Sequence, residues 1–197
     1  MKVIGITGYI GSGKSTVSRM FQEKGFYYFD SDSYVASMNR NKKVILEIQK
    51  YFPQSIVNNQ LDKKILKEIL FKDYEKNIAI LERIYHPFVI KKVKRLIFIS
   101  KFLFRKFLLL EVPLLFESKI NELCDITILV KCSLDTQVKR VIKRSKMNRE
   151  DINKIMTKQN RLNYENISFN YIIDTDTSIS ELEKKVAKIF REISHNE

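Results

Sequence analysis

The stretch GYIGSGKST, residues 8–16, is the part of this chain that decides its fold. It matches the pattern G-x-x-x-x-G-K-[ST]. In this pattern glycines let backbone N–H groups turn toward a phosphate, the lysine neutralises the outer phosphates of a nucleotide, and the last hydroxyl binds Mg²⁺. A plain glycine-rich turn is the alternative, but the full pattern is rare in a chain of this length. The stretch therefore predicts a nucleotide-binding loop made of Gly8, Gly11, Ser12, Gly13, Lys14, Ser15 and Thr16.

The sequence on either side of this loop fits a parallel α/β fold. The apolar run KVIGIT before it predicts a strand, and residues 14–24 predict a helix whose N-terminal end favours a phosphate. Strands separated by helices indicate a parallel sheet with helices on both faces. We therefore expect an α/β fold of the P-loop NTPase type with a five-stranded parallel sheet. The four further strands are predicted at residues 25–30, 106–116, 125–132 and 170–174, and the later helices at 136–144 and from about 180.

The distribution of glycine narrows the class of P-loop protein. All five glycines lie within the first 25 residues, so neither a D-x-x-G switch of GTPases nor the glycine-containing signature of transporter ATPases can follow. A P-loop chain this short without those motifs is best interpreted as a small-molecule kinase. Such an enzyme needs a lobe for the acceptor, a basic lid and a carboxylate near the transferred phosphoryl group.

Two segments are candidates for that lobe and that lid. Apolar residues recur at helical spacing between the second and third strands, as at Ile65 and Ile69, and Pro53 and Pro87 punctuate this helical stretch. We expect one kinase domain over residues 1–197, with a helical acceptor-binding insertion at about 33–105 and a basic lid at about 140–165.

The stretch YFDSDSY supplies the carboxylate. Asp30 and Asp32 follow the second predicted strand, at the edge of the sheet where ligands bind in such folds. Aspartate is also a preferred helix N-cap, so one of the two is expected to cap. At least one of the two is expected to take part in the reaction.

The net charge of +13 allows three interpretations: a lysine-rich composition, phosphate-rich small substrates or nucleic acid. The basic residues are spread along the chain without an aromatic RNA-binding motif or zinc-finger spacing, so composition is favoured and nucleic acid comes last. We therefore expect small-molecule substrates and no nucleic-acid partner.

No stretch approaches the length of a membrane span, because the most apolar one, residues 96–110, is interrupted by Lys101, Arg105 and Lys106. Cys124 and Cys132 are too few for a disulfide framework. We therefore expect a cytoplasmic protein with no membrane partner. The sequence leaves the oligomeric state open.

The ordered motifs resemble the dephospho-CoA kinase family over nearly the whole chain. They are GITGYIGSGKSTV, FDSD, His86-Pro87, VPLLFE at 112–117, TQVKRVIKR and QNR at 159–161. The resemblance implies transfer of the γ-phosphoryl group of ATP to the ribose 3′-hydroxyl of dephospho-CoA, the last step of coenzyme A biosynthesis, with Mg²⁺. Two departures stand out. Glu111 replaces the Asp of many members, and residues 172–178 lack the usual Asn-x-Gly, which affects the adenine side and the choice between ATP and GTP.

The resemblance also implies roles for individual residues. Asp32 matches the general base, Lys14 the phosphate-neutralising lysine and Arg140 the lid arginine that reaches the transferring phosphoryl group. His86 is either a structural histidine beside a proline or a substrate contact, and its match to the His-Pro of the family favours a place in the acceptor site. Ser15 of the phosphate loop is expected to bind Mg²⁺ directly. Glu111, by its place at a strand end, is expected either to orient a water bound to that ion or to be a buried carboxylate with a structural partner. Arg144 and Arg149 are weaker lid candidates.

Two other functions compete with this one. The first is a nucleoside-monophosphate kinase, which the FDSD and VPLLFE motifs disfavour. The second is a nucleic-acid-binding P-loop ATPase, which only the net charge supports.

Overall fold

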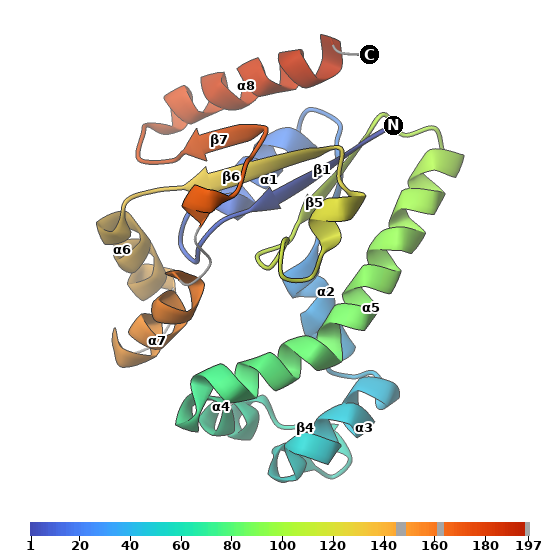
Figure 1. The fold of residues 1–197 in the computed structure, drawn as a ribbon, viewed down its shortest axis with the longest axis vertical. Coiled ribbons are helices and arrows are strands. Elements are labelled where there is room, and N and C mark those ends of the chain that lie inside the picture. Colours follow the sequence, from blue (N-terminus) through green and yellow to red (C-terminus); the bar gives the residue numbers. More distant parts are fainter. Residues whose placement is uncertain (145–148, 161–163, 196–197) are drawn as a thin grey trace. The chain divides into compact units, whose positions relative to one another are not determined.

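The computed structural model describes residues 1–144, 149–160 and 164–195 (Figure 1). Its central feature is a sheet of five parallel strands in the order β2-β5-β1-β6-β7, with β1 in the middle. The predicted α/β fold with a five-stranded parallel sheet is confirmed. The strands are β1 (Lys2–Thr7), β2 (Tyr27–Asp30), β5 (Phe107–Glu111), β6 (Ile126–Lys131) and β7 (Tyr171–Asp174).

The register brings the carboxyl ends of the strands to one edge of the sheet. Glu111 at the end of β5 pairs with Asp30 at the end of β2 on one side and with Ile6 near the end of β1 on the other. Lys131 and Asp174 pair at the ends of β6 and β7. Loops that follow these strands therefore meet at the edge where such folds bind ligands.

One face of the sheet is covered by α1 (Lys14–Gln22) and α8 (Ile179–His195). Both helices carry an apolar stripe, from which Phe21 and Val186 are fully buried against strand residues such as Ile4 and Ile128. Burial of this kind stabilises a domain by roughly 25 cal/mol per Å² of apolar surface. Because α1 is packed against the sheet, the position of the loop that joins β1 to α1 is fixed.

Residues Ser31–Val93 form a compact unit of their own, and residues 1–30 and 94–197 form the other. The Ser31–Val93 unit has its own core, in which Val44, Ile48 and Leu66 are buried with Ile84 and Tyr85. Its elements are α2 (Ser31–Met38), α3 (Lys42–Tyr51), η1 (Pro53–Ser55), β3 (Ile56–Val57), β4 (Gln60–Leu61), α4 (Lys63–Lys72) and the first part of α5 (Tyr74–Phe102).

The structure differs from the sequence prediction at two places in this stretch. A small antiparallel hairpin, β3–β4, interrupts the expected helices. Its turn is Asn58-Asn59, and both residues have positive φ angles (49° and 59°), which asparagine tolerates better than most residues. In addition, Pro87 does not interrupt its helix: α5 runs through it for 29 residues, because buried neighbours such as Ile84 and Val89 hold the helix on both sides.

The segment after the fourth sheet strand is helical. It comprises α6 (Leu134–Arg144), α7 (Arg149–Asn160) and η3 (Tyr164–Asn166). Val141 of α6 packs with Ile152 and Met156 of α7. Of the QNR motif, Arg161 and the side chains of Gln159 and Asn160 lie outside the described residues, as does the side chain of Arg149. Within the described ranges, none of the helices combines the length and the apolar composition that a membrane crossing requires.

Candidate active site

The loop between β1 and α1 has the backbone shape that its glycines predict. Gly13 stands immediately before α1 with φ +94°, a left-handed angle that favours glycine. A Cβ atom at Gly8 would lie 2.1 Å from the carbonyl oxygen of Val130, so no side chain fits there. The first turn of α1 therefore directs its N–H groups into a loop that has no Cβ atoms at these two positions, an arrangement suited to a phosphate.

Lys14 folds back over this loop. Its Nζ donates hydrogen bonds to the carbonyl oxygens of Gly8 (2.8 Å) and Tyr9 (3.0 Å). The hydroxyl of Ser12 is buried and has no hydrogen-bond partner within the described part of the chain. A cation and a hydroxyl are thus placed at a loop whose shape suits an anion.

Ser15, Glu111 and Tyr28 form a chain of hydrogen bonds beside the loop. Ser15 Oγ donates to Glu111 Oε1 over 2.8 Å, and the Tyr28 hydroxyl donates to Glu111 Oε2 over 2.6 Å. Glu111 is only 4% exposed, and each of its two carboxylate oxygens accepts a hydrogen bond from one of these hydroxyls. Ser15 and Glu111 are both predicted from the sequence, whereas Tyr28 is not. The available signal was the β-strand alternation that places Tyr28 and Asp30 on the same face of β2.

The oxygen atoms of Ser15 and Glu111 fit Mg²⁺, a hard cation that binds few protein oxygens together with substrate phosphates and water. Among the residues that the structure describes, no group of three or more His, Cys, Asp or Glu side chains could hold a metal. The chain therefore offers a partial set of oxygen ligands at the phosphate loop, which a nucleotide would complete.

Arg140 of α6 links the phosphate loop to the segment after β7. Its guanidinium donates to the Oγ1 and the carbonyl oxygen of Thr175 (2.8 and 3.0 Å) and to the carbonyl oxygen of Gly11 (3.3 Å). Thr175 Oγ1 in turn donates to the carbonyl oxygen of Ser12 (2.7 Å). Thr175 is not among the predicted site residues, because its contact with the phosphate loop joins segments 163 positions apart in the sequence.

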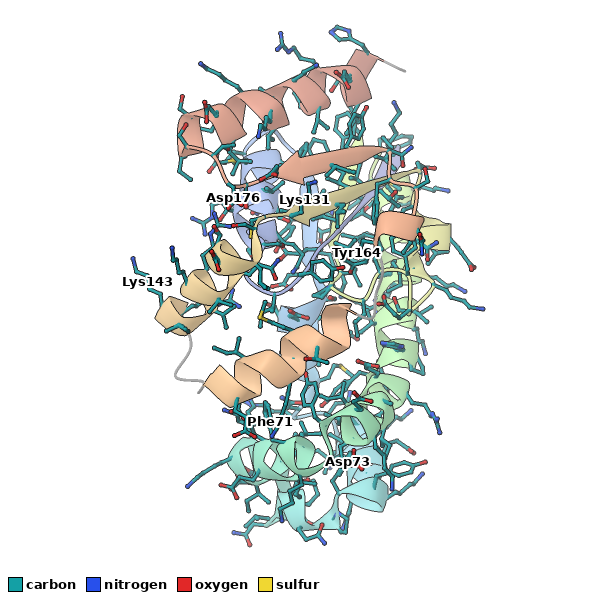
Figure 2. All side chains as sticks on the ribbon, turned by 60° about the vertical axis from the view of Figure 1, so that its left-hand side comes forward. Phe71, Asp73, Lys131, Lys143, Tyr164 and Asp176 are labelled. Carbon is teal, nitrogen blue, oxygen red and sulfur yellow. The ribbon has the colours of Figure 1, made fainter. Side chains whose placement is uncertain are left out.

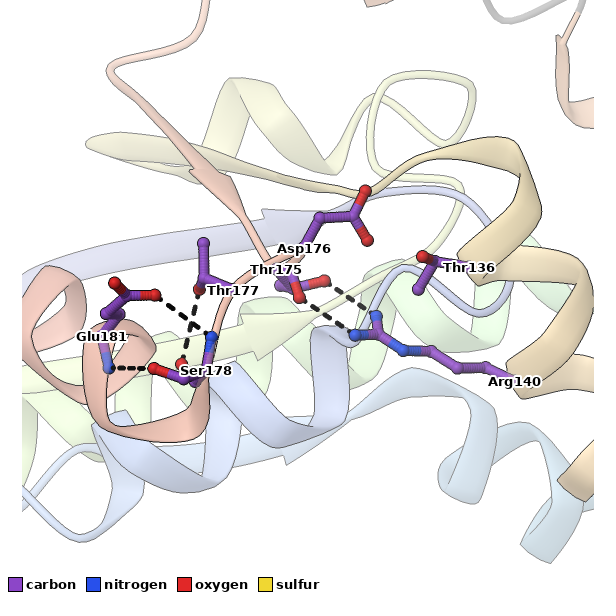
Figure 3. A pocket seen from close by; sticks show the side chains of 7 residues that line it. All are labelled: Thr136, Arg140, Thr175, Asp176, Thr177, Ser178 and Glu181. Carbon is purple, nitrogen blue, oxygen red and sulfur yellow. Dashed lines mark hydrogen bonds between the residues drawn. The ribbon is translucent and has the colours of Figure 1, made fainter.

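An open pocket of about 630 Å³ adjoins these contacts (Figure 3). Asp176 accepts a hydrogen bond from the backbone N–H of Ser133 (2.5 Å). Hydrogen bonds from Thr136 and from Ser133 lower the pKa of this exposed carboxyl group below its usual value, which keeps it ionised. Residues 172–178, which lack the Asn-x-Gly of the dephospho-CoA kinase family, are therefore hydrogen-bonded to the residue that precedes α6. The pocket is lined by Thr136, Arg140, Thr175, Asp176, Thr177, Ser178 and Glu181.

Tyr164 of η3, labelled in Figure 2, contacts Tyr9 of the phosphate loop and Thr7 at the end of β1. Its ring lies 4.8 Å from that of Tyr9, between ring centroids, and its hydroxyl is 3.2 Å from Thr7 Oγ1 at the end of β1. Burial raises the pKa of the Tyr164 hydroxyl to about 12, so the group is neutral at ordinary pH. Tyr164 lies at the end of the predicted lid segment 140–165 but is not among the predicted site residues.

The remaining predicted residues are placed as follows. Asp32 lies in the first turn of α2 and is exposed, and His86 is half-buried within α5. Both belong to the Ser31–Val93 unit, whereas the phosphate loop, Glu111 and Arg140 belong to the other unit. Arg144 is exposed at the end of α6.

Comparison with known proteins gives a consistent result. A family model described as dephospho-CoA kinase matches residues 2–181. The chain is 39% identical over 189 residues to a dephospho-CoA kinase of Fusobacterium nucleatum, covering 94% of this chain and 95% of that one. The crystal structure of TT1252 from Thermus thermophilus aligns with a TM-score of 0.74 and 30% identity over 97% of both chains.

A more distant structural neighbour shows the fold alone. The shikimate kinase of Acinetobacter baumannii has a TM-score of 0.56 and 16% identity, and the alignment covers 100% of this chain and 95% of that one.

Proposed function

This chain belongs to the dephospho-CoA kinase family and is an ATP-dependent dephospho-CoA kinase. We propose that the loop at residues 8–16, together with Arg140 and Asp32, catalyses the reaction. The observation that carries the assignment is the family match over residues 2–181, which includes the complete phosphate loop. The product is coenzyme A, at the final step of its biosynthesis.

The phosphate loop binds the donor. Its backbone N–H groups and the N-terminal end of α1 hold the phosphates of ATP, and Lys14 exchanges its contacts with the Gly8 and Tyr9 carbonyls for the β- and γ-phosphates. Arg140 of α6 donates to the carbonyl oxygen of Gly11 in the loop, and it is proposed to reach the transferring phosphoryl group from there. Both cations act on negative charge, which in phosphoryl transfer is spread over the phosphate oxygens.

Ser15 and Glu111 are the proposed Mg²⁺ site. Ser15 Oγ, which donates a hydrogen bond to Glu111 Oε1 in this structure, would bind the ion directly. Glu111 would hold a water molecule bound to the ion. A bound Mg²⁺ supplies charge neutralisation at the β- and γ-phosphate oxygens. The buried carboxylate of Glu111 keeps a fixed orientation because Tyr28 donates to its second oxygen.

Asp32 is the proposed general base. As the ribose 3′-oxygen of dephospho-CoA bonds to the γ-phosphorus, the bond from that phosphorus to the bridging oxygen of ADP breaks and the hydroxyl proton passes to Asp32. Asp32 is exposed in the first turn of α2, so its carboxylate is accessible to a substrate. His86 of the same unit is proposed to contact the acceptor, and the segment 140–165 to act as a lid over the donor.

We also place the reaction in the cytoplasm. Cys124 and Cys132 are both free thiols, and burial raises the pKa of Cys124 to about 12. Unpaired cysteines are the usual state in a reducing compartment.

The test is a reaction of purified enzyme with ATP, Mg²⁺ and dephospho-CoA, followed by mass spectrometry for coenzyme A. Parallel reactions offer AMP, CMP and UMP as acceptors, and a reaction with chelator in place of Mg²⁺ tests the metal. We expect phosphorylation of dephospho-CoA alone, and none with chelator. Phosphorylation of a nucleoside monophosphate without turnover of dephospho-CoA would contradict the assignment.

A further inference from the structure

An apolar and basic surface lies at the C-terminal end of α5, away from the residues used above. Phe98 and Phe102 are four positions apart and so lie on one face of the helix, and Leu103 and Phe104 follow directly. Phe102 is 74% exposed and Phe104 is 93% exposed, and the other two are more than half exposed. Single exposed apolar residues are common, but four adjacent ones usually mark a contact site. These four side chains are called the α5 aromatic surface below.

Phe104 is held outward by the way α5 ends. The N–H of Phe104 bonds to the carbonyl of Lys101 (3.1 Å) and the N–H of Arg105 to that of Ser100 (3.0 Å), which is the bonding pattern of a Schellman helix end. Phe104 occupies the left-handed position of this motif with φ +51°, where glycine is by far the preferred residue. A phenyl ring at this position is strained and also exposed, so its presence is not explained by folding.

The turn that carries Phe104 is anchored at its base. The guanidinium of Arg105 lies 3.3 Å from the centroid of the Tyr27 ring on β2. The carbonyl of Lys106 accepts a hydrogen bond from the N–H of Lys2 (2.9 Å), and Phe107 is already buried in β5. The aromatic side chains are therefore presented on a rigid support.

The charge around this surface has one sign. Lys94 and Arg95 precede Phe98 by one helical turn, and Lys101 and Lys106 border Phe102 and Phe104. All four basic side chains are exposed, and residues 94–106 contain no Asp or Glu. A partner that complements this surface must combine negative charge with an apolar layer beneath it.

We propose that the α5 aromatic surface docks this enzyme reversibly on an anionic lipid bilayer. Aromatic and leucine side chains enter the boundary between headgroups and acyl chains, while neighbouring lysines bind the acidic headgroups. The sequence predicted no membrane partner because residues 96–110 cannot span a bilayer, but adsorption to its surface requires no span.

Two other partners fit the surface less well. A second copy in a symmetric dimer would place the same basic residues opposite one another, and like charges repel. A single-stranded nucleic acid would suit the aromatic rings and the charge, yet it is usually held in a groove, and the aromatic residues here project from a helix end.

The experiment is co-sedimentation of the full-length protein with vesicles of phosphatidylcholine, alone or mixed with phosphatidylglycerol, at low and high salt. We expect binding to the mixed vesicles only, weakened by salt. Phe102→Ser and Phe104→Gly should each reduce that binding by on the order of 10-fold, because each variant loses the free energy gained when one aromatic side chain leaves water. Phe104→Gly should leave the melting temperature unchanged or raise it, since glycine relieves the left-handed strain.

A matched control is Tyr51→Ser at the end of α3, where the ring is 50% exposed and Lys50 lies beside it. This variant should bind the vesicles like the wild type. The proposal is overturned if the wild type does not bind mixed vesicles, or if the Phe102 and Phe104 variants bind them normally. It is also overturned if these variants instead lose binding to a single-stranded oligonucleotide, or lose a dimer seen by sedimentation, while vesicle binding is unaffected.

Discussion

The hydroxyl of Tyr28 donates to Glu111 Oε2 over 2.6 Å, and this contact leaves Oε1 of the same carboxylate directed at Ser15. Tyr28 stands on β2 and Glu111 at the end of the neighbouring β5. The carboxylate is buried, so its orientation depends on these two donors. Tyr28 is therefore a positioning residue for the proposed Mg²⁺ site.

Tyr28→Phe tests this role. The substitution keeps the ring but leaves a buried carboxylate oxygen without its donor, and loss of such an outer contact typically weakens metal binding by about 10- to 100-fold. We expect the Mg²⁺ concentration for half-maximal activity to rise, and Mg²⁺-dependent binding of ATP, measured by calorimetry, to weaken in the same way. ATP binding in chelator should not change. The neighbouring Tyr27→Phe is the control; if both variants behave alike, Tyr28 has no special role.

Lys14→Ala tests the donor site. The ammonium group neutralises charge that grows at the β–γ bridge of ATP, and loss of such a preorganised contact usually lowers turnover by about 10²–10³. The two hydrogen bonds to the Gly8 and Tyr9 carbonyls are only partly buried, so the melting temperature should change little. Steady-state kinetics with circular dichroism melting checks both points. Turnover within a few-fold of the wild type would exclude Lys14 from the mechanism.

Asp32→Asn and Asp30→Asn separate the two carboxylates after β2. Asp32→Asn removes the proton acceptor at nearly constant size and should lower turnover by roughly 10²–10⁴, while ATP binding survives. Asp30 is half-buried at the end of β2 and is expected to cap or brace the loop there, so Asp30→Asn should affect stability more and turnover less. Turnover, ATP affinity and melting temperature are measured for both. The assignment of the base is reversed if Asp30→Asn is inactive and Asp32→Asn is not.

Thr175→Val tests the link between Arg140 and the phosphate loop. Valine matches threonine in shape but removes the donor to the Ser12 carbonyl and the acceptor for Arg140. A buried hydrogen bond lost in this way costs about 1–3 kcal/mol in the free energy of unfolding. We expect that loss of stability in urea unfolding, together with a higher KM for ATP. Thr177→Val, which lines the same pocket without these contacts, should show neither effect.

Tyr164 is one of the groups that make the stability of the fold depend on pH in the alkaline range. Its pKa is about 12 in the folded chain against a reference value of 10.0, so only the unfolded chain loses this proton between those values. The contribution of Tyr164 to the free energy of unfolding is therefore complete below pH 10 and is lost as the pH rises toward 12. Urea unfolding at intervals over this range should show the decline, and Tyr164→Phe should make it shallower. An unchanged slope in Tyr164→Phe would show that other groups cause it.

The sequence by itself determined the class of fold and the phosphate loop. The loop is one contiguous stretch, so its backbone geometry, such as the left-handed angle at Gly13, and the side chains of Lys14 and Ser15 come from neighbouring positions in the sequence. The strands could be predicted because their buried faces require apolar runs, which a reader can recognise without knowing their partners. The small β3–β4 hairpin escaped prediction, since two-residue strands carry almost no pattern beyond the Asn58-Asn59 turn.

Only the tertiary structure decided which side chains meet. Tyr28 and Glu111 are 83 positions apart, and Thr175 reaches the phosphate loop across 163 positions. Such contacts depend on strand order and register, which set β5 beside β2 and bring the segment after β7 to the loop after β1. The same holds for Pro87, which lies inside α5 although a proline costs a helix one hydrogen bond. Its neighbours are buried against residues distant in sequence, and this burial outweighs the local cost. The packing energy comes from many contacts, whereas the cost of the proline arises at a single residue.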